Sequence, residues 1–229
     1  GIISLWFLPL PNAPPAPLTL FAVGHGQAAL AKTVQGHQIV VDCGSLQGGA
    51  RAARRIHVAL TRCTIDLLVI THDDLDHHNG VPYLLQRLKV LRAVMPAALE
   101  HSELHTLLID HGCRTQLLQP GQQALLLPDT RVFAPDLPSD ASDNDLSLWM
   151  DIEIHDTSIL LTGDAQELGI AAALASGLVN RCDVLVLPHH GRRNANAPHL
   201  LRRTQPQACL ASAATDDGTT LIGKVVRNF

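Results

Sequence analysis

The stretch from Thr71 to Gly80, THDDLDHHNG, decides how this chain is interpreted. It follows the apolar run IDLLVI, which predicts a buried strand. Alternate side chains of an extended turn point the same way, so His72 and Asp74 would face one metal ion. Asp76 and His77 would reach a second ion nearby. Two close divalent ions can activate water for hydrolysis, so the stretch predicts a hydrolytic metal centre.

Acidic and His residues also gather in ordinary surface loops, and the stretch alone leaves that alternative open. Two later segments favour a site. The apolar run 158–162 leads to Asp164, and the apolar run 183–187 leads to His189 and His190. In α/β proteins, ligands bind beyond the carboxyl ends of strands. Three strands that each end in ligand-type side chains therefore predict one site assembled from distant parts of the chain.

The composition fits a globular α/β protein. The chain has 229 residues, of which 46% are hydrophobic and 17% are charged. The formal net charge of −4 argues against a protein that coats nucleic acid. The five cysteines are widely spaced without a C-x-x-C pair, which predicts buried apolar side chains and no disulfide framework.

The ligand motifs extend from residue 71 to residue 191, so one site needs most of the chain and we expect one domain over 18–229. Residues 1–10 (GIISLWFLPL) are strongly apolar, and the Pro-rich residues 11–17 predict a stiff linker. The apolar segment is too short to cross a bilayer by itself, which takes roughly 20 residues. Two interpretations stay open: an N-terminal strand, or the last turns of a membrane helix.

Hydrophobic periodicity predicts strands and helices in alternation along the chain. Two strand-rich halves, each flanked by helices, predict an αββα sandwich of the α/β class. We expect strands at 18–23, 28–34, 38–42, 66–70, 90–94, 116–118, 124–127, 131–133, 148–154, 158–162, 183–187 and 208–212, and helices at 49–60, 80–88, 100–110, 165–175 and 198–203.

The order H-x-D-x-D-H, then LLTGD, then PHHG resembles the metallo-β-lactamase superfamily, although Asp74 stands where that superfamily usually has His. This version is similar to the hydrolase domain of the ComEC family, the membrane channels of DNA uptake in naturally competent bacteria. Segments 21–28, 39–44 and 144–148 are also similar to that family. The resemblance runs from about residue 18 to about residue 212.

The resemblance implies a metal-dependent deoxyribonuclease that acts during DNA uptake for natural transformation. It also implies DNA, a membrane-embedded channel portion of the same protein and other DNA-uptake proteins as partners. The location that the resemblance implies is the extracytoplasmic face of the bacterial inner (cell) membrane. The resemblance also favours the membrane-helix interpretation of residues 1–10.

Six side chains are the expected metal ligands. His72 and Asp74 would bind one ion and Asp76 and His77 the other, while Asp164 would bridge them. His190 or His189 would complete the set; the resemblance alone ranks His190 first and leaves His189 as a catalytic hydrogen-bond partner. Asp76, where the metal does not fully engage it, would also orient or deprotonate the water.

Three carboxylates and three imidazoles make a harder donor set than the usual His-rich site of the superfamily. Such a set shifts the preference of the two divalent ions toward Mn²⁺ or Mg²⁺, although Zn²⁺ binds more tightly where it is available.

The expected substrate contacts are Asn144, at the end of a loop, and Arg192 and Arg193, directly after the ligand histidines. Arginines here would bind phosphates without reading sequence. Arg51, Arg54 and Arg55 share another helix face, and solvated surface is the alternative for all of these arginines. Aromatic rings for base stacking are scarce, with Trp149 the one candidate.

Two other functions stay open. The same fold supports a small-molecule metallohydrolase, such as a phosphodiesterase or a lactonase. A catalytically weak module that guides DNA is the third hypothesis. It is favoured by the sequence after Ser212, which lacks the late N-x-x-x-H-P element expected from the resemblance.

Overall fold

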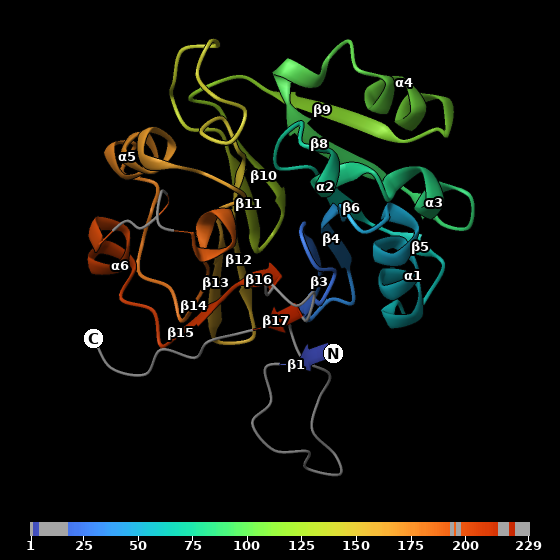
Figure 1. Cartoon of the computed structure of the whole chain (residues 1–229), viewed down its shortest axis with the longest axis horizontal. Helices are drawn as coiled ribbons and strands as arrows, with labels where there is room; N and C mark the ends of the chain where they lie inside the picture. The colour runs from blue at the N-terminus through green and yellow to red at the C-terminus, as the bar shows by residue number, and fades with distance from the viewer. Residues whose placement is uncertain (1, 5–17, 193–194, 196–197, 215–219, 223–229) are drawn as a thin grey trace.

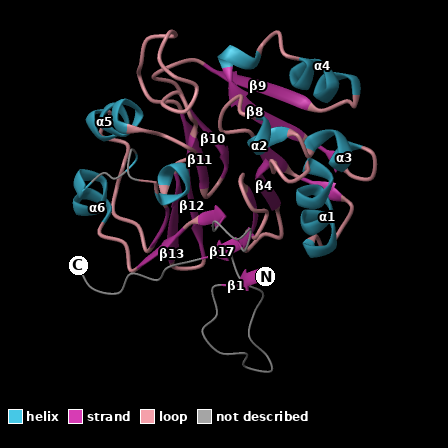
Figure 2. Ribbon diagram, viewed as in Figure 1, coloured by secondary structure: helices cyan, strands magenta, loops and turns pink. Residues whose placement is uncertain are grey.

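Two mixed β-sheets lie face to face, and helices cover the outer face of each sheet (Figure 1). The computed structural model describes residues 2–4, 18–192, 195, 198–214 and 220–222. Within this part of the chain, strands form the two inner layers and helices form the two outer ones (Figure 2). This is the αββα sandwich that the sequence predicts.

The first sheet has seven strands in the order β1-β2-β3-β4-β6-β8-β9. Neighbours from β1 to β4 are antiparallel, and neighbours from β4 to β9 are parallel. The strands are β1 (Ile2–Ser4), β2 (Leu18–Phe21), β3 (Ala28–Lys32), β4 (Gln38–Cys43), β6 (Leu67–Val69), β8 (Arg92–Pro96) and β9 (Arg114–Leu118).

The second sheet repeats this plan with six strands in the order β10-β11-β12-β13-β14-β15. The pairs from β10 to β13 are antiparallel, and the pairs from β13 to β15 are parallel. The strands are β10 (Gln123–Leu127), β11 (Thr130–Phe133), β12 (Trp149–Ile154), β13 (Thr157–Leu161), β14 (Val184–Val186) and β15 (Ala208–Leu210). Two small sheets pair β5 (Thr64–Ile65) with β7 (Lys89–Val90) and β16 (Ser212–Ala214) with β17 (Thr220–Ile222).

The helices divide between the two outer layers (Figure 1). On the first sheet lie α1 (Gly49–Ala59), α3 (Val81–Leu85) and α4 (Glu103–Asp110), and on the second lie α5 (Glu167–Ala175) and α6 (Pro198–Thr204). The short helix α2 (Leu75–His78) and the 3₁₀ turns η1 (Ala97–Leu99) and η2 (Pro188–Gly191) complete the described elements.

Alternate residues of a strand face opposite sides of its sheet, and β4 uses both. Ile39 and Val41 lie in the apolar layer between the sheets, together with Met150 of β12. Val40 points outward and joins the cluster that contains Ile56 of α1. Because both faces are covered, every residue of β4 is buried, as is usual where a strand has parallel neighbours inside an α/β fold.

Helix α2 is the main element that differs from expectation. The expected helix 80–88 begins at Val81, and one more helical turn precedes it within the metal-type loop. The Asp74 carbonyl accepts from the His77 N–H, which closes this turn. Gly80 separates the two helices and donates its N–H to the Cys43 carbonyl at the end of β4. This tertiary contact is invisible to periodicity.

Four of the cysteines are buried free thiols, as expected, but Cys63 is exposed. At the N-terminus, Ile2–Ser4 pair with β2 as strand β1, and residues 5–17 lie outside the described residues. A domain boundary at residue 18 stays a prediction. In the described part of the chain, no helix has the length and apolarity needed to span a membrane.

Candidate metal centre

The candidate site lies where strands of both sheets end. His72 follows the end of β6 by three residues, Asp164 follows β13 by three, and His189 follows β14 by three. Asp42 is the last residue but one of β4. Because β4 and β6 are parallel, their carboxyl ends lie at one edge of the first sheet. The carboxyl ends of β13 and β14 likewise lie at one edge of the second sheet. The fold therefore brings together the three segments that the sequence singles out.

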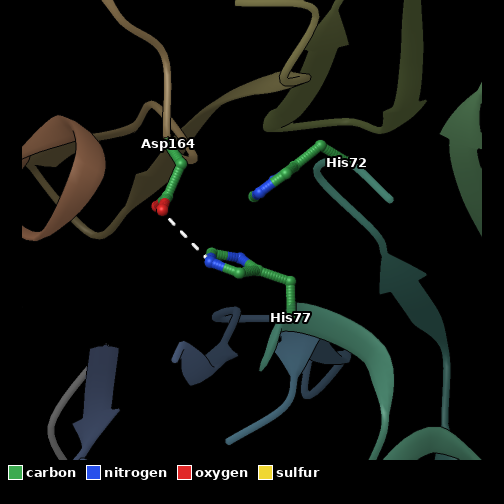
Figure 3. Close-up of side chains that lie close together, drawn as sticks. All are labelled: His72, His77 and Asp164. Carbon is green, nitrogen blue, oxygen red and sulfur yellow. Dashed lines mark ion pairs between the residues drawn. The ribbon is translucent and has the colours of Figure 1, made fainter. Parts of the chain in front are cut away.

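Three buried polar atoms at this edge face one another without a hydrogen-bond partner. They are Nε2 of His72, Nε2 of His77 and Oδ1 of Asp164. The ligand atoms of this group all lie within 4.8 Å of one another. His77 Nε2 is 3.4 Å from Asp164 Oδ1, and the three side chains converge on one point (Figure 3). Buried polar atoms are nearly always paired, so this convergence needs an explanation.

The contacts of Nδ1 in both histidines explain why their Nε2 atoms are left without a hydrogen-bond partner. Nδ1 of His77 lies 2.8 Å from Asp42 Oδ2, and Nδ1 of His72 lies 2.9 Å from Thr71 Oγ1. Thr71 donates its hydroxyl to Asp42, so it accepts from His72. Each neutral imidazole then carries its proton on Nδ1 and presents the lone pair of Nε2 to the shared point.

Asp42 holds this arrangement from behind. It is fully buried and also accepts hydrogen bonds from the Thr71 N–H and from Gln27 Nε2. Sequence reasoning did not propose Asp42 as a site residue. The signal was present, because an apolar strand ends there in a carboxylate, as the strand before Asp164 nearly does. Carboxylates that orient a ligand histidine are usual partners in metal sites.

A second group lies beside the first and shares His77. It consists of Asp76, His77 and His190, whose ligand atoms also lie within 4.8 Å of one another. His190 Nε2 is 3.2 Å from Asp164 Oδ2, so Asp164 reaches both groups. The structure thus brings Asp76 and His77 into one group and Asp164 within reach of both groups, and their roles as metal ligands stay predictions.

Asp74 lies beside His72 but outside both groups. Its Oδ2 lies 3.3 Å from His72 Nε2, but its side chain is 47% exposed and it belongs to neither group. The short helix α2 begins after Asp74, with Asp74 extended at its N-terminus. His72 therefore contacts Asp74 and also converges with His77 and Asp164 on one point, and a ligand role for Asp74 stays a prediction.

The loop that carries Asp76 is held by backbone contacts. Gln27 donates its N–H to the Asp76 carbonyl at 3.1 Å. A Cβ on Gly44 would lie 2.2 Å from the carbonyl carbon and oxygen of Asp76, so no larger residue fits at the end of β4. Asn79, just after α2, pairs both ends of its amide with the backbone of Ser45. These contacts fix α2 against β4.

The two halves of the chain meet beside the site. Leu148 donates its N–H to the Thr71 carbonyl at 2.8 Å, and Asp164 donates its N–H to Ser147 Oγ at 3.2 Å. Gly163 has a φ of +55°, and a Cβ there would lie 2.8 Å from the Ser147 side chain. Residues before Asp164 thus turn sharply and let its carboxylate reach the histidines of the first half.

Asn144, a predicted substrate contact, lies in the loop that leads to Ser147. Its buried Oδ1 has no hydrogen-bond partner, and its carbonyl accepts from the Ser147 N–H. The neighbouring Asp145 accepts from the N–H groups of Gln166 and Gly169, which caps the start of α5. The loop is therefore anchored to the segment after Asp164.

The two adjacent histidines face different partners. His190 faces Asp164, whereas His189 lies 3.5 Å from Arg192 Nη1 through its Nε2. Both have positive φ values, 45° and 55°, which turn successive rings apart. Arg192 also contacts His25 Nε2, a residue that sequence reasoning missed. Arg193, the second predicted arginine, lies outside the described residues.

Charge compensation shifts the pKa values of the central residues in the metal-free chain. Burial by itself would lower the pKa of His77, but the flanking carboxylates of Asp164 and Asp42 raise it well above its usual value. Burial would raise the pKa of Asp164, but His77 and His190 hold it well below its usual range. Burial lowers the pKa of His189, and nearby Arg192 adds to this effect.

This donor set fits divalent metal ions. Two imidazoles and a carboxylate present atoms without a hydrogen-bond partner to one point, and a second group of the same chemistry adjoins it. Imidazole and carboxylate ligands suit Zn²⁺, Mn²⁺ and Fe²⁺, and the number of carboxylates favours the harder of these ions.

Trp149 does not offer a stacking surface. Its side chain is fully buried in the apolar cluster of the second sheet, 5.8 Å from the ring of Phe133 between centroids. Its burial removes the one candidate for base stacking near the arginines. Alternation puts Trp149 on the outer face of the second sheet, where it joins the cluster that contains Ile170 of α5.

Comparisons with known proteins agree with the geometry. Residues 23–125 match the model of the metallo-β-lactamase superfamily. The chain is 27% identical to ComE operon protein 3 of Bacillus subtilis (strain 168) over 159 residues, which is 67% of this chain and 20% of that protein. It is also 27% identical to Recombination protein 2 of Haemophilus influenzae over 194 residues, which is 83% of this chain and 23% of that protein.

The chain thus spans about a fifth of the length of these curated relatives. Among solved structures, the metallo-β-lactamase fold protein YhfI from Bacillus subtilis is similar, with a TM-score of 0.54 and 14% identity. That similarity covers 74% of this chain and 70% of YhfI, and it shows the fold.

Proposed function

Because this chain carries a metallo-β-lactamase superfamily domain, we propose that it is a metal-dependent hydrolase that cleaves phosphodiester bonds of DNA. The observation that carries the proposal is the convergence of three buried, unpartnered atoms from His72, His77 and Asp164. Two of them come from the first half of the chain and one from the second. A structural role alone would leave these atoms paired.

Two divalent ions are the proposed cofactors, with Mn²⁺ favoured over Zn²⁺ and Mg²⁺. His72, His77 and Asp164 would hold one, and Asp76 and His190 would hold the other, with Asp164 shared between the two. His77 lies in both groups, but its Nε2 has one lone pair and would bind one of the two ions. When bound, the ions would lower the pKa of water and offset the charge that develops on the scissile phosphate.

The chain's own residues orient the reactants. Asp76, partly exposed and held by its backbone, is placed to accept a proton from the attacking water or to orient it. His189 is not needed as a ligand by either group, and its lowered pKa keeps it neutral. A neutral imidazole beside Arg192 is suited to a hydrogen bond with the leaving oxygen.

The cations and amides at the rim are the proposed substrate contacts. Arg192 is exposed and would bind a non-bridging phosphate oxygen, as would Arg193. Asn144 lies in the loop that leads to Ser147, and the buried oxygen of its side-chain amide has no hydrogen-bond partner. An arginine binds phosphate without reading bases, so the proposed cleavage is independent of sequence.

DNA uptake for natural transformation is the proposed setting. Support comes from the similarity to ComE operon protein 3 and Recombination protein 2, and from the sequence features shared with the ComEC family. The proposed partners are DNA, a membrane-embedded portion of the same protein and other DNA-uptake proteins. The proposed location is the extracytoplasmic face of the inner (cell) membrane.

The test is hydrolysis of linear and circular DNA by the purified chain with Mn²⁺, Zn²⁺ or EDTA. We expect cleavage with a divalent ion, none with EDTA, and loss of cleavage in Asp76→Ala. The matched control is Asp73→Ala, which removes an exposed carboxylate of the same loop that belongs to neither ligand group.

Undiminished cleavage in Asp76→Ala would overturn the site assignment. If a folded chain cleaves DNA with none of these ions, the proposal that it is a nuclease is wrong. Salt separates a DNA substrate from a small neutral one, because each phosphate contact makes affinity for DNA fall as salt rises.

A further inference from the structure

The outer face of the first sheet carries a hollow between α1 and α3, lined by residues outside both ligand groups of the metal centre. The two helices lie side by side at the right of Figure 1. The hollow has a volume of about 660 Å³. Its apolar lining includes Ala53 and Leu84, and its charged and aromatic lining comprises Arg54, His57, Tyr83 and Arg87. The metal centre uses none of these side chains.

The charge of this region has one sign. Residues 43–65 contain four arginines and no Asp or Glu, and residues 77–99 contain two arginines and a lysine, again without an acid. These two segments include both walls of the hollow. In a chain with a formal net charge of −4, the two segments that form these walls thus carry positive charge alone. Such a face attracts a polyanion.

The arginines of the hollow have no acidic partner. Arg54 and Arg87 are exposed, and neither takes part in the salt bridges found among the described residues. Arg54 and His57 stand three residues apart on one face of α1. Tyr83 of α3 and Arg87, in the turn after that helix, line the opposite wall. Their donors are available to a ligand in the hollow.

Tyr83 adds a flat apolar surface between these cations. It is the chain's only tyrosine, it is 44% exposed, and among the described residues it is the one exposed side chain of the Phe, Trp and Tyr class. A ring next to arginines is the combination that binds single-stranded nucleic acid, because bases stack on the ring while phosphates contact the cations. Duplex DNA would offer the phosphates but no free base.

The position of the hollow connects it to the metal centre. The backbone of Gly49, the first residue of α1, touches the backbone of Asn79 and Gly80 at the end of the metal-type loop. Helix α3 begins directly after Gly80. Both walls therefore start at the site and run away from it along the outer face.

We propose that this hollow is an accessory binding site for a single strand of nucleic acid, with Arg54 and Arg87 on phosphates and Tyr83 under a base. That the ligand is a nucleic acid rests on the proposed function, whereas the location of the binding site rests on the hollow, its positive charge and the exposed ring of Tyr83. The site holds the strand beside the metal centre without taking part in the chemistry.

The test is binding of a fluorescent oligothymidylate to the full chain in EDTA, followed by fluorescence anisotropy at several salt concentrations. We expect Arg54→Ala/Arg87→Ala to raise Kd about tenfold or more and to reduce the slope of log affinity against log salt by about 1.4, since each single-strand contact contributes about 0.7. We expect Tyr83→Ala to raise Kd about fivefold or more, and Tyr83→Phe to retain the affinity.

The matched control is Arg51→Ala, which removes an exposed arginine of the same helix that does not line the hollow. Unchanged affinity in the double variant, or an equal loss in Arg51→Ala, would overturn the proposal. So would binding to phosphatidylglycerol vesicles without binding to the oligonucleotide, because the face would then serve a membrane.

Hydrolysis of bis(p-nitrophenyl) phosphate with Mn²⁺ keeps this outcome separate from the proposed function. That substrate is too small to reach the hollow from the metal centre. We expect Arg54→Ala/Arg87→Ala and Tyr83→Ala to hydrolyse it at the rate of the unmodified chain. We expect Asp76→Ala to lose this hydrolysis. Activity without oligonucleotide binding would overturn the accessory site alone.

Discussion

At the residue scale, His77 links the two candidate ligand groups, and Asp42 orients it from behind through a 2.8 Å contact at Nδ1. We expect Asp42→Asn to weaken metal binding about 10- to 100-fold while the fold persists, because partners of ligand histidines contribute about that much. Calorimetric titration with Mn²⁺ measures the change. The control is Asp151→Asn, which breaks an ion pair with Arg131 away from the site; equal affinity in both variants would contradict the role of Asp42.

The pH dependence of the metal-free chain is a second prediction for these side chains. His77 has a pKa raised well above 6.5, so its stabilising contribution is complete below pH 6.5 and is lost as pH rises through the folded-state pKa. Asp164 has a pKa well below 3.8, so its contribution is present above that pH and is lost as pH falls through the folded-state value.

The pair therefore stabilises the metal-free chain most between about pH 4 and 6.5. We expect the melting temperature in EDTA to decrease from pH 6.5 to pH 8, and Asp164→Asn to flatten that decrease. Calorimetric scans at successive pH values measure both effects. A melting temperature that increases over this range would contradict the assignment, because it would mean that His77 is neutral between its two carboxylates.

At the element scale, the end of β4 and helix α2 touch through backbone atoms. Gly44→Ala would place a Cβ 2.2 Å from the Asp76 backbone, which forces α2 away from β4. We expect a loss of about 1–3 kcal/mol of stability, the usual cost of overpacking, together with weaker metal binding. Gly177→Ala is the control, since its Cβ meets open space and it carries only the left-handed backbone cost of roughly 1–2 kcal/mol.

Denaturant unfolding and Mn²⁺ titration distinguish the two glycine variants. Gly177→Ala should keep the metal affinity of the unmodified chain. If Gly44→Ala also keeps it, α2 does not depend on this contact for its position.

At the scale of the whole molecule, the site joins two halves of the chain that each contribute a sheet. His72 and His77 come from the first half, and Asp164 and His190 come from the second. An ion bound by both halves favours the folded state by mass action, by about 2.7 kcal/mol at a hundredfold excess over Kd. We therefore expect Mn²⁺ to raise the melting temperature.

The same shift should vanish in Asp164→Ala and persist in His101→Ala, which removes an exposed histidine outside both ligand groups. Thermal scans with Mn²⁺ and with EDTA measure it. A shift of equal size in Asp164→Ala would place the ion elsewhere on the chain.

The sequence by itself determined the sandwich and the candidate ligands, because both depend on local pattern. Alternation in β12 and the apolar runs of β6, β13 and β14 are properties of a few consecutive residues, and each ligand follows its strand closely. The parallel pairing of β13 with β14 then puts Asp164 and His190 at one edge of the second sheet, and the packing of the two sheets brings that edge to His72.

Only the tertiary structure decided how these side chains face one another. The contact of Asp42 with His77 joins residues 35 positions apart, and the positive φ values of His189 and His190 turn one ring to Asp164 and the other to Arg192. Burial of Trp149 and exposure of Tyr83 beside Arg54 depend on which helix covers which strand. Such relations come from packing between segments distant in sequence, which no local pattern encodes.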